Sequence, residues 1–156
     1  GGARFAVLLP ALDRQAEPVP VPRAADRVPR TTLKGRVLVV EDEEGVAAFM
    51  RDLLESWSLE VTVATDPAVA LDRFARDPSR FDAVITDQTM PGMTGLTLAA
   101  RLAALKPGLP ILLYTGYGEG ITPAMLAQAG VARLLAKPLE PVIAYTALAS
   151  VLETAR

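Results

Sequence analysis

The chain of 156 residues contains no cysteine, so neither a disulfide framework nor a thiolate zinc site can form. This absence fits the cytoplasmic location that we expect. The net charge is −2, and no cluster of basic residues could follow a nucleic-acid backbone. The longest apolar run falls far short of the roughly 18 residues of a membrane span, and no signal peptide opens the chain. We therefore expect neither nucleic acid nor membrane as a partner of this fragment.

The composition is that of a globular domain with a tail, since 51% of the residues are hydrophobic and 22% are charged. Five of the thirteen prolines fall within residues 1 to about 32, and Glu17–Pro22 alternates proline with other residues. Such a segment is extended and semi-rigid, which predicts a linker. The chain begins with Gly1 rather than methionine, so we expect it to be part of a longer protein.

From Lys34 onward, short apolar runs alternate with helical patterns. Runs of four to six apolar, often β-branched residues predict buried parallel strands, here at 36–40, 60–64, 82–86, 110–114 and 131–135. The intervening patterns predict helices at 44–57, 67–76, 94–106, 121–129 and 141–154. Asp66, Thr122 and Glu140 each precede a proline that would begin a helix, while Gly108 and Gly130 stand where helices should end. Five right-handed βα units predict a doubly wound, three-layer α/β/α domain.

Residues able to bind metal or phosphate follow four of the predicted strands. Glu41, Asp42 and Glu43 follow the first strand and Asp87 follows the third. A hydroxyl and an ammonium group follow the last two strands, at Thr115 and Lys137. Because parallel strands end at one edge of the sheet, these groups should meet in one crevice. The set fits a divalent cation with oxygen ligands and a phosphoryl group.

Each of these residues also has an ordinary interpretation. Acids after a strand can stabilise a helix N-terminus, Asp87 can belong to a turn, Thr115 can begin a loop, and Lys137 can extend to the surface. The cost of gathering the acids argues against a purely structural role. Two unit charges 4 Å apart repel by about 4 kcal/mol at an effective dielectric constant of about 20. Clustered carboxylates therefore indicate a metal site, a raised pKa, or both.

Four motifs give residues 34–156 a specific resemblance. Val37–Glu43, Asp82–Gly95, Tyr114–Tyr117 and Ala136–Leu139 occur in the order and spacing typical of the receiver domain of two-component signalling. The resemblance implies a flavodoxin-like sheet of strand order 2-1-3-4-5. It also implies phosphorelay signal transduction, with a phosphoryl group taken from a phosphohistidine in the presence of Mg²⁺ (or Mn²⁺).

The resemblance also implies individual roles. Asp87 resembles the phosphoacceptor, Thr115 the switch hydroxyl, and Lys137 the lysine that pairs with the phosphoryl group. The implied metal ligands are Asp42, Asp87, the backbone carbonyl of Thr89 and, through water, Glu41. Leu134 stands where the family usually has an aromatic switch residue. Leucine has no ring, so we expect no aromatic rotamer change there.

The leader has a resemblance of its own. Residues 2–10 are similar to the glycine-rich end of a histidine-kinase ATPase domain, which implies a hybrid sensor histidine kinase. The expected organisation is an ATPase remnant at 1–12, a linker at 13–33 and a receiver at 34–156. The fragment should accept phosphate without ATP-dependent kinase activity of its own. Its expected partners are a phosphohistidine domain of the parent chain, a histidine phosphotransfer protein and a second copy bound through the fourth helix, fifth strand and fifth helix.

Three other functions stay open at this stage. The chain could be a stand-alone single-domain response regulator. It could be a phosphatase-like enzyme with an aspartyl nucleophile, although such enzymes usually carry two aspartates two residues apart after the first strand, where this chain has Glu41 and Glu43. It could also be an interaction module that works without phosphate, in which case Asp87 would be inert.

Overall fold

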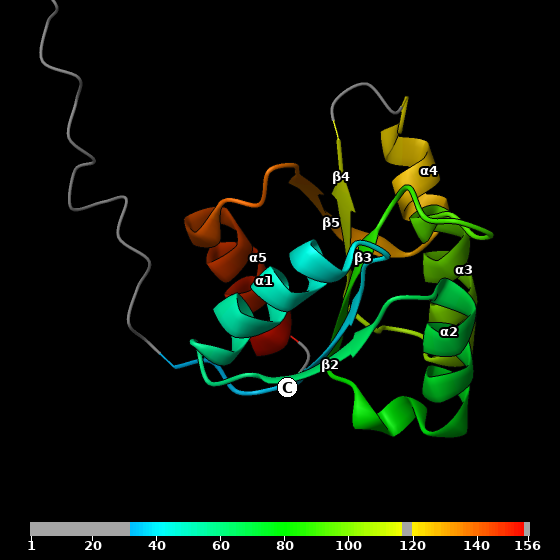
Figure 1. Cartoon of the computed structure of the whole chain (residues 1–156). Coiled ribbons are helices and arrows are strands. Elements are labelled where there is room, and N and C mark those ends of the chain that lie inside the picture. The colour runs from blue at the N-terminus through cyan, green and yellow to red at the C-terminus, as the bar shows by residue number, and fades with distance from the viewer. Residues whose placement is uncertain (1–31, 117–119, 155–156) are drawn as a thin grey trace, which may run out of the picture.

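The computed structural model describes residues 32–116 and 120–154, which form a three-layer α/β/α domain (Figure 1). The strands are β1 (Arg36–Val40), β2 (Glu60–Ala64), β3 (Ala83–Asp87), β4 (Ile111–Thr115) and β5 (Val131–Ala136). The helices are α1 (Glu44–Glu55), α2 (Pro67–Arg76), α3 (Gly95–Leu105), α4 (Pro123–Gln128) and α5 (Pro141–Thr154), with a short 3₁₀ turn η2 (Pro78–Arg80). The predicted ATPase remnant at 1–12 and nearly all of the predicted linker at 13–33 lie outside the described residues.

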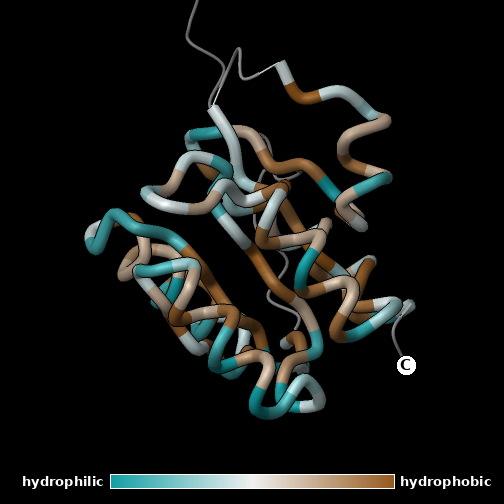
Figure 2. Tube along the Cα trace, turned by 90° about the vertical axis from the view of Figure 1, so that its right-hand side faces the viewer, coloured by the Kyte–Doolittle hydropathy of each residue, from teal (hydrophilic) through white to brown (hydrophobic). Residues whose placement is uncertain are grey.

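All strand pairs are parallel, in the order β2-β1-β3-β4-β5, so the predicted topology is confirmed. Alternate residues of each strand face opposite layers. In β1, Val37 and Val39 face the core under α1 and α5, whereas Leu38 and Val40 face the core under α2 and α3. The apolar strands run through the middle of the molecule in Figure 2, with polar segments outside them.

Local chemistry sets the helix ends close to their predicted positions. The carboxylate of Asp66 accepts hydrogen bonds from the N–H groups of Ala68 and Val69, at 2.7 and 3.1 Å, and so caps α2. Thr122 caps α4 by accepting from Met125 at 3.3 Å. Gly108 and Gly130 adopt φ angles of 82° and 71°, the left-handed conformation predicted for them after α3 and α4. The turn η2 was not predicted.

The prediction that every strand is buried is wrong for β5. Leu135 is buried, but 46% of Leu134 is exposed and most of the strand faces outward. β5 lies at the edge of the sheet, and its neighbour α4 has only six residues. A helix of that length extends about 9 Å, whereas six strand residues span about 20 Å, so α4 cannot cover the strand. Leu134 and the exposed Ile143 border a groove of about 400 Å³ between β5 and α5, and nothing in the structure shows what covers it.

Gly95, the first residue of α3, packs against the backbone at the end of β3. Its N–H donates to the carbonyl of Gln88 at 2.9 Å. A methyl group at this position would overlap the carbonyl oxygen of Asp87 and lie 2.7 Å from a methyl carbon of Leu113. Only glycine therefore allows α3 to begin this close to the end of the strand.

Gly95→Ala should consequently lower the free energy of unfolding by about 1–3 kcal/mol or more, the usual cost of overpacking. Urea unfolding measures this change. Gly45→Ala in α1 is the matched control, because an added methyl group there meets nothing within 4 Å. That control should be neutral or stabilising, since alanine favours helices more than glycine does. Equal stabilities of the two variants would contradict the proposed close contact.

Candidate functional site

The residues predicted to meet do gather at the carboxyl edge of the sheet. Glu41 and Asp42 follow β1 directly, Asp87 is the last residue of β3, Thr115 the last of β4, and Lys137 follows β5. Because β1, β3, β4 and β5 are consecutive neighbours, four strands present these side chains to one another. No membrane-spanning helix occurs in the described part of the chain, since none of its helices is long and apolar enough.

Asp87 is the centre of this arrangement. It is 2% exposed, and its Oδ1 lies 2.8 Å from Nζ of Lys137. The same oxygen accepts a hydrogen bond from the backbone N–H of Gln88 at 2.7 Å. Burial disfavours the charged form of Lys137, but its hydrogen bond with Asp87 and the charges of Asp87 and Glu41 outweigh burial and raise the pKa of Lys137. The surroundings therefore favour the charged form of the lysine beside the carboxylate.

Glu41 is almost completely buried and only partly satisfied. Its Oε1 accepts a hydrogen bond from the N–H of Glu43 at 3.2 Å, while its buried Oε2 has no hydrogen-bond partner among the described residues. Burial raises the pKa of Glu41, the hydrogen bond from Glu43 opposes that shift, and the nearby charge of Asp87 adds to it. An unpaired buried carboxylate oxygen is costly, and a bound cation would relieve that cost.

Three carboxylates form a group that suits a cation. Glu41, Asp42 and Asp87 each place one oxygen within 4.8 Å of the others. Mg²⁺ and Mn²⁺ prefer such hard oxygen ligands and keep several waters, so a site of two or three carboxylates with an outward-facing side fits either ion. The buried Oε2 of Glu41, which has no hydrogen-bond partner among the described residues, is a second observation in favour of a cation at this place. The carbonyl of Thr89, predicted as a further ligand, lies in the loop after β3, and its role stays a prediction.

Thr115 and Lys137 are joined through the backbone. The N–H of Lys137 donates to the carbonyl of Thr115 at 2.8 Å, which extends the pairing of β4 with β5 beyond the strand ends. Thr115 is buried, and its hydroxyl donates to the carbonyl of Gly116 at 3.3 Å. The Lys137–Pro138 peptide bond is cis. The hydroxyl and the ammonium group thus lie at the ends of neighbouring strands, and the switch role of Thr115 stays a prediction.

Two residues that the sequence did not single out also contact the site. Gln88 donates its N–H to Asp87, and its side-chain oxygen accepts from the N–H of Leu96 at 3.1 Å, which ties the loop to α3. The ring of Tyr114 lies under Nζ of Lys137, 4.9 Å from it. Both lie inside the motifs of the receiver resemblance, one next to Asp87 and one next to Thr115, but the motifs gave no role to either residue.

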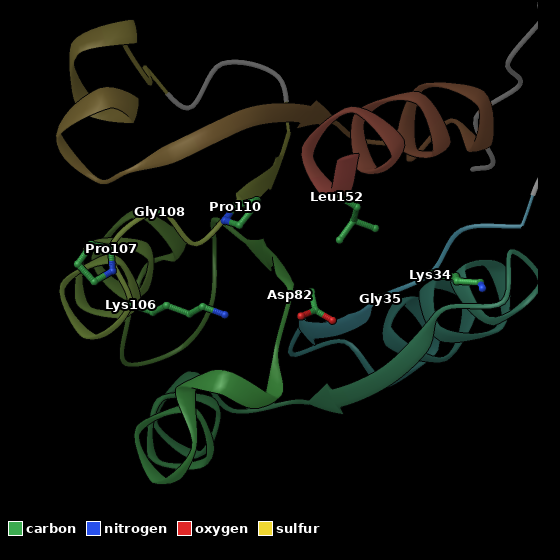
Figure 3. A pocket seen from close by; sticks show the side chains of 8 residues that line it. All are labelled: Lys34, Gly35, Asp82, Lys106, Pro107, Gly108, Pro110 and Leu152. Atoms are coloured by element: carbon green, nitrogen blue, oxygen red, sulfur yellow. The ribbon is translucent and has the colours of Figure 1, made fainter. Parts of the chain in front are cut away.

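A separate cavity of about 480 Å³ opens at the opposite edge of the sheet (Figure 3). Asp82 borders this cavity and binds the guanidinium of Arg36 at 3.1 Å. The hydrogen bond from Arg36 lowers the pKa of Asp82 although partial burial opposes the shift. Lys106 also borders it and donates to the carbonyl of Phe81 at 2.7 Å. Both of these charged groups already have partners. The cavity lies at the amino ends of the strands, whereas the acidic site lies at their carboxyl ends, so the cavity is not part of that site.

The sequence profile of the response regulator receiver domain matches residues 37–149. The chain is 32% identical over 109 residues to the transcriptional regulatory protein FixJ of Bradyrhizobium diazoefficiens, covering 70% of this chain and 52% of FixJ. It is 37% identical over 105 residues to a protein-glutamate methylesterase/protein-glutamine glutaminase of Anaeromyxobacter dehalogenans, covering 66% of this chain and 29% of that protein. A receiver domain protein from Clostridium thermocellum has the same fold, with a TM-score of 0.72 at 24% identity over 76% of this chain and 94% of the other.

The chain therefore belongs to the response regulator receiver domain family. It spans about half of FixJ and less of the methylesterase. The match covers the receiver portion only, so the activities in the names of these larger proteins are not thereby transferred to this chain.

Proposed function

We propose that Asp87 accepts a phosphoryl group from a phosphohistidine. The observation that carries the proposal is the buried carboxylate of Asp87, held 2.8 Å from Lys137 and within 4.8 Å of two further acids. A carboxylate oxygen of Asp87 attacks phosphorus, the P–N bond to the donor imidazole breaks, and the imidazole leaves with the bonding electron pair. The product is an aspartyl phosphate.

The surrounding residues are assigned roles that follow from their charge and position. Glu41, Asp42 and Asp87, with the carbonyl of Thr89, would hold Mg²⁺ or Mn²⁺, which when bound offsets the charge of the phosphoryl oxygens. Lys137 exchanges its contact with Asp87 for a phosphoryl oxygen. The hydroxyl of Thr115 then donates to the product, and this new hydrogen bond is the structural signal.

We infer that the donor belongs to the parent protein of this chain, a hybrid sensor histidine kinase. The support is the similarity of residues 2–10 to the end of a kinase ATPase domain, followed by a proline-rich segment. A proline-rich linker of about twenty residues could span tens of ångströms, at roughly 3.1 Å per residue, and so reach a histidine domain in the same chain. A stand-alone response regulator with a separate donor is the alternative. Membership of the receiver family does not favour the alternative of a phosphatase-like enzyme.

The chain mixed with ATP and Mg²⁺ should remain unphosphorylated, because it has no histidine to carry the donor phosphate. A longer version that includes the sequence upstream of Gly1 should label from ATP and pass the label to Asp87. Radiolabel on the isolated receiver, separated by proteolysis in the linker, measures the transfer, and the same protein with Asp87→Asn is the control. A longer version that labels from ATP but never transfers would contradict the hybrid-kinase proposal and leave the acceptor proposal intact.

A further inference from the structure

The aromatic ring of Tyr114 contacts the ammonium group of Lys137. Nζ of Lys137 lies 4.9 Å from the centroid of the Tyr114 ring, within the range of a cation–π interaction. The ring is 5% exposed, so water competes little for the ammonium group on that side. We propose that Tyr114 is a positioning residue for phosphoryl transfer, which holds Lys137 in line with Asp87. This inference rests on the proposed function.

The sheet register explains why the ring is available at this place. In the pairing of β3 with β4, Tyr114 lies opposite Asp87. The N–H of Gln88 is shared between Oδ1 of Asp87, at 2.7 Å, and the carbonyl of Tyr114, at 2.9 Å. In the pairing of β4 with β5, Tyr114 lies opposite Leu135, two residues before Lys137. Paired residues of parallel strands project to the same face, so the ring stands between the carboxylate and the strand that carries the lysine.

The surroundings of the phenol keep it neutral. Burial raises the pKa of Tyr114, and an interaction with the backbone of Leu139 opposes that shift without cancelling it. The neutral ring therefore keeps its negative face available to the ammonium group of Lys137.

The ring matters most when the charge of Asp87 is lost. In the resting site, the carboxylate itself holds Lys137 at 2.8 Å. As Asp87 attacks phosphorus, its negative charge passes toward the phosphoryl oxygens, and the ion pair weakens. The attraction of the ring for the ammonium group does not depend on that charge. Tyr114 therefore keeps Lys137 beside the reacting atoms while the lysine changes partners.

A purely structural role for Tyr114 makes a different prediction. Tyr114 belongs to the core cluster under α1 and α5, so any loss of the ring lowers stability whether or not Lys137 is affected. Tyr145 of α5 belongs to the same cluster, is 6% exposed, and packs against Trp57 with ring centroids 5.3 Å apart. Replacing Tyr145 removes a comparable buried aromatic side chain that is not among the residues of the site. Tyr145→Leu is therefore the matched control.

The test compares Tyr114→Phe, Tyr114→Leu, Tyr114→Met and Tyr145→Leu in the full chain. Acetyl phosphate at saturating concentration with Mg²⁺ serves as the donor, and intact mass gives the rate of phosphorylation below each melting temperature. We expect the phosphorylation rate to fall about tenfold in Tyr114→Leu and Tyr114→Met. In Tyr114→Phe the rate should stay within about twofold of wild type, as a cation–π contact of this kind predicts. Tyr145→Leu should lose stability and keep its rate.

An NMR measurement reads the contact without phosphorylation. The side-chain methylene protons of Lys137 next to Nζ should show an upfield ring-current shift in wild type and Tyr114→Phe, which disappears in Tyr114→Leu and Tyr114→Met. Wild-type rates in the Leu and Met variants, or a rate loss in Tyr114→Phe equal to theirs, would overturn the positioning role. A wild-type chain that accepts no phosphate would instead overturn the proposed function, whatever the ring-current shifts show.

Discussion

Replacing Asp87 with asparagine should abolish phosphorylation while leaving the fold intact. The amide has nearly the volume of the carboxylate, so the side chain still fits its buried place at the end of β3. It lacks the negative oxygen that would attack phosphorus in the proposed transfer, and no other acid stands at the end of that strand. Intact mass after incubation with acetyl phosphate and Mg²⁺ should show one added phosphoryl group in wild type and none in the variant.

The control for this variant is Asp72→Asn. Asp72 is an exposed acid on α2 that pairs with Arg76 and takes no part in the site. It should accept phosphate like wild type, which shows that loss of one carboxylate elsewhere is harmless. If Asp87→Asn still gained the mass of a phosphoryl group, another residue would be the acceptor and the assignment of Asp87 would be wrong.

Magnesium should raise the melting temperature of the chain, and Asp42→Asn should lose most of that gain. The three clustered acids face one lysine, so negative charge is in excess until a cation binds. A ligand present at about a hundred times its Kd stabilises the folded state by about 2.7 kcal/mol. Thermal unfolding with and without MgCl₂, at matched ionic strength, measures the gain, and MnCl₂ should act similarly.

Glu43→Gln is the matched control for the metal, because Glu43 is exposed and its side chain lies outside the group of three acids. Its magnesium gain should equal that of wild type. Without metal, Asp42→Asn should be at least as stable as wild type, since one repulsive charge is gone. Equal magnesium gains in wild type and Asp42→Asn would exclude Asp42 as a ligand.

The fold was largely predictable because its signals are local. The five strands lie within one residue of their predicted limits, since buried β-branched runs and capped helix starts mark both sides of each boundary. The exposure of β5 was not predictable in the same way. Leu134 is apolar and fits a buried strand, but it is exposed because β5 lies at the edge of the sheet beside a helix of only six residues.

The residues of the site also differ in whether the sequence alone could predict their contacts. The meeting of charged residues at strand ends, such as Asp87 and Lys137, could be predicted because parallel strands bring their ends together. Gln88 contributes a backbone N–H and Tyr114 the face of a ring, which any residue and any aromatic residue can supply. Their contributions depend on register and direction, and these appear only in three dimensions.

Localisation of the phosphoryl group in the wild-type chain tests the central claim most directly. Borohydride reduces an aspartyl phosphate to the alcohol homoserine, which stays fixed during digestion and peptide mass spectrometry. After treatment with acetyl phosphate and Mg²⁺, the reduced residue should be Asp87 alone, and omission of Mg²⁺ should remove most of the signal. Reduction at Glu41, Asp42 or another acid, or no reduced residue in a chain that gained the phosphoryl mass, would contradict the assignment of Asp87 as the phosphoacceptor.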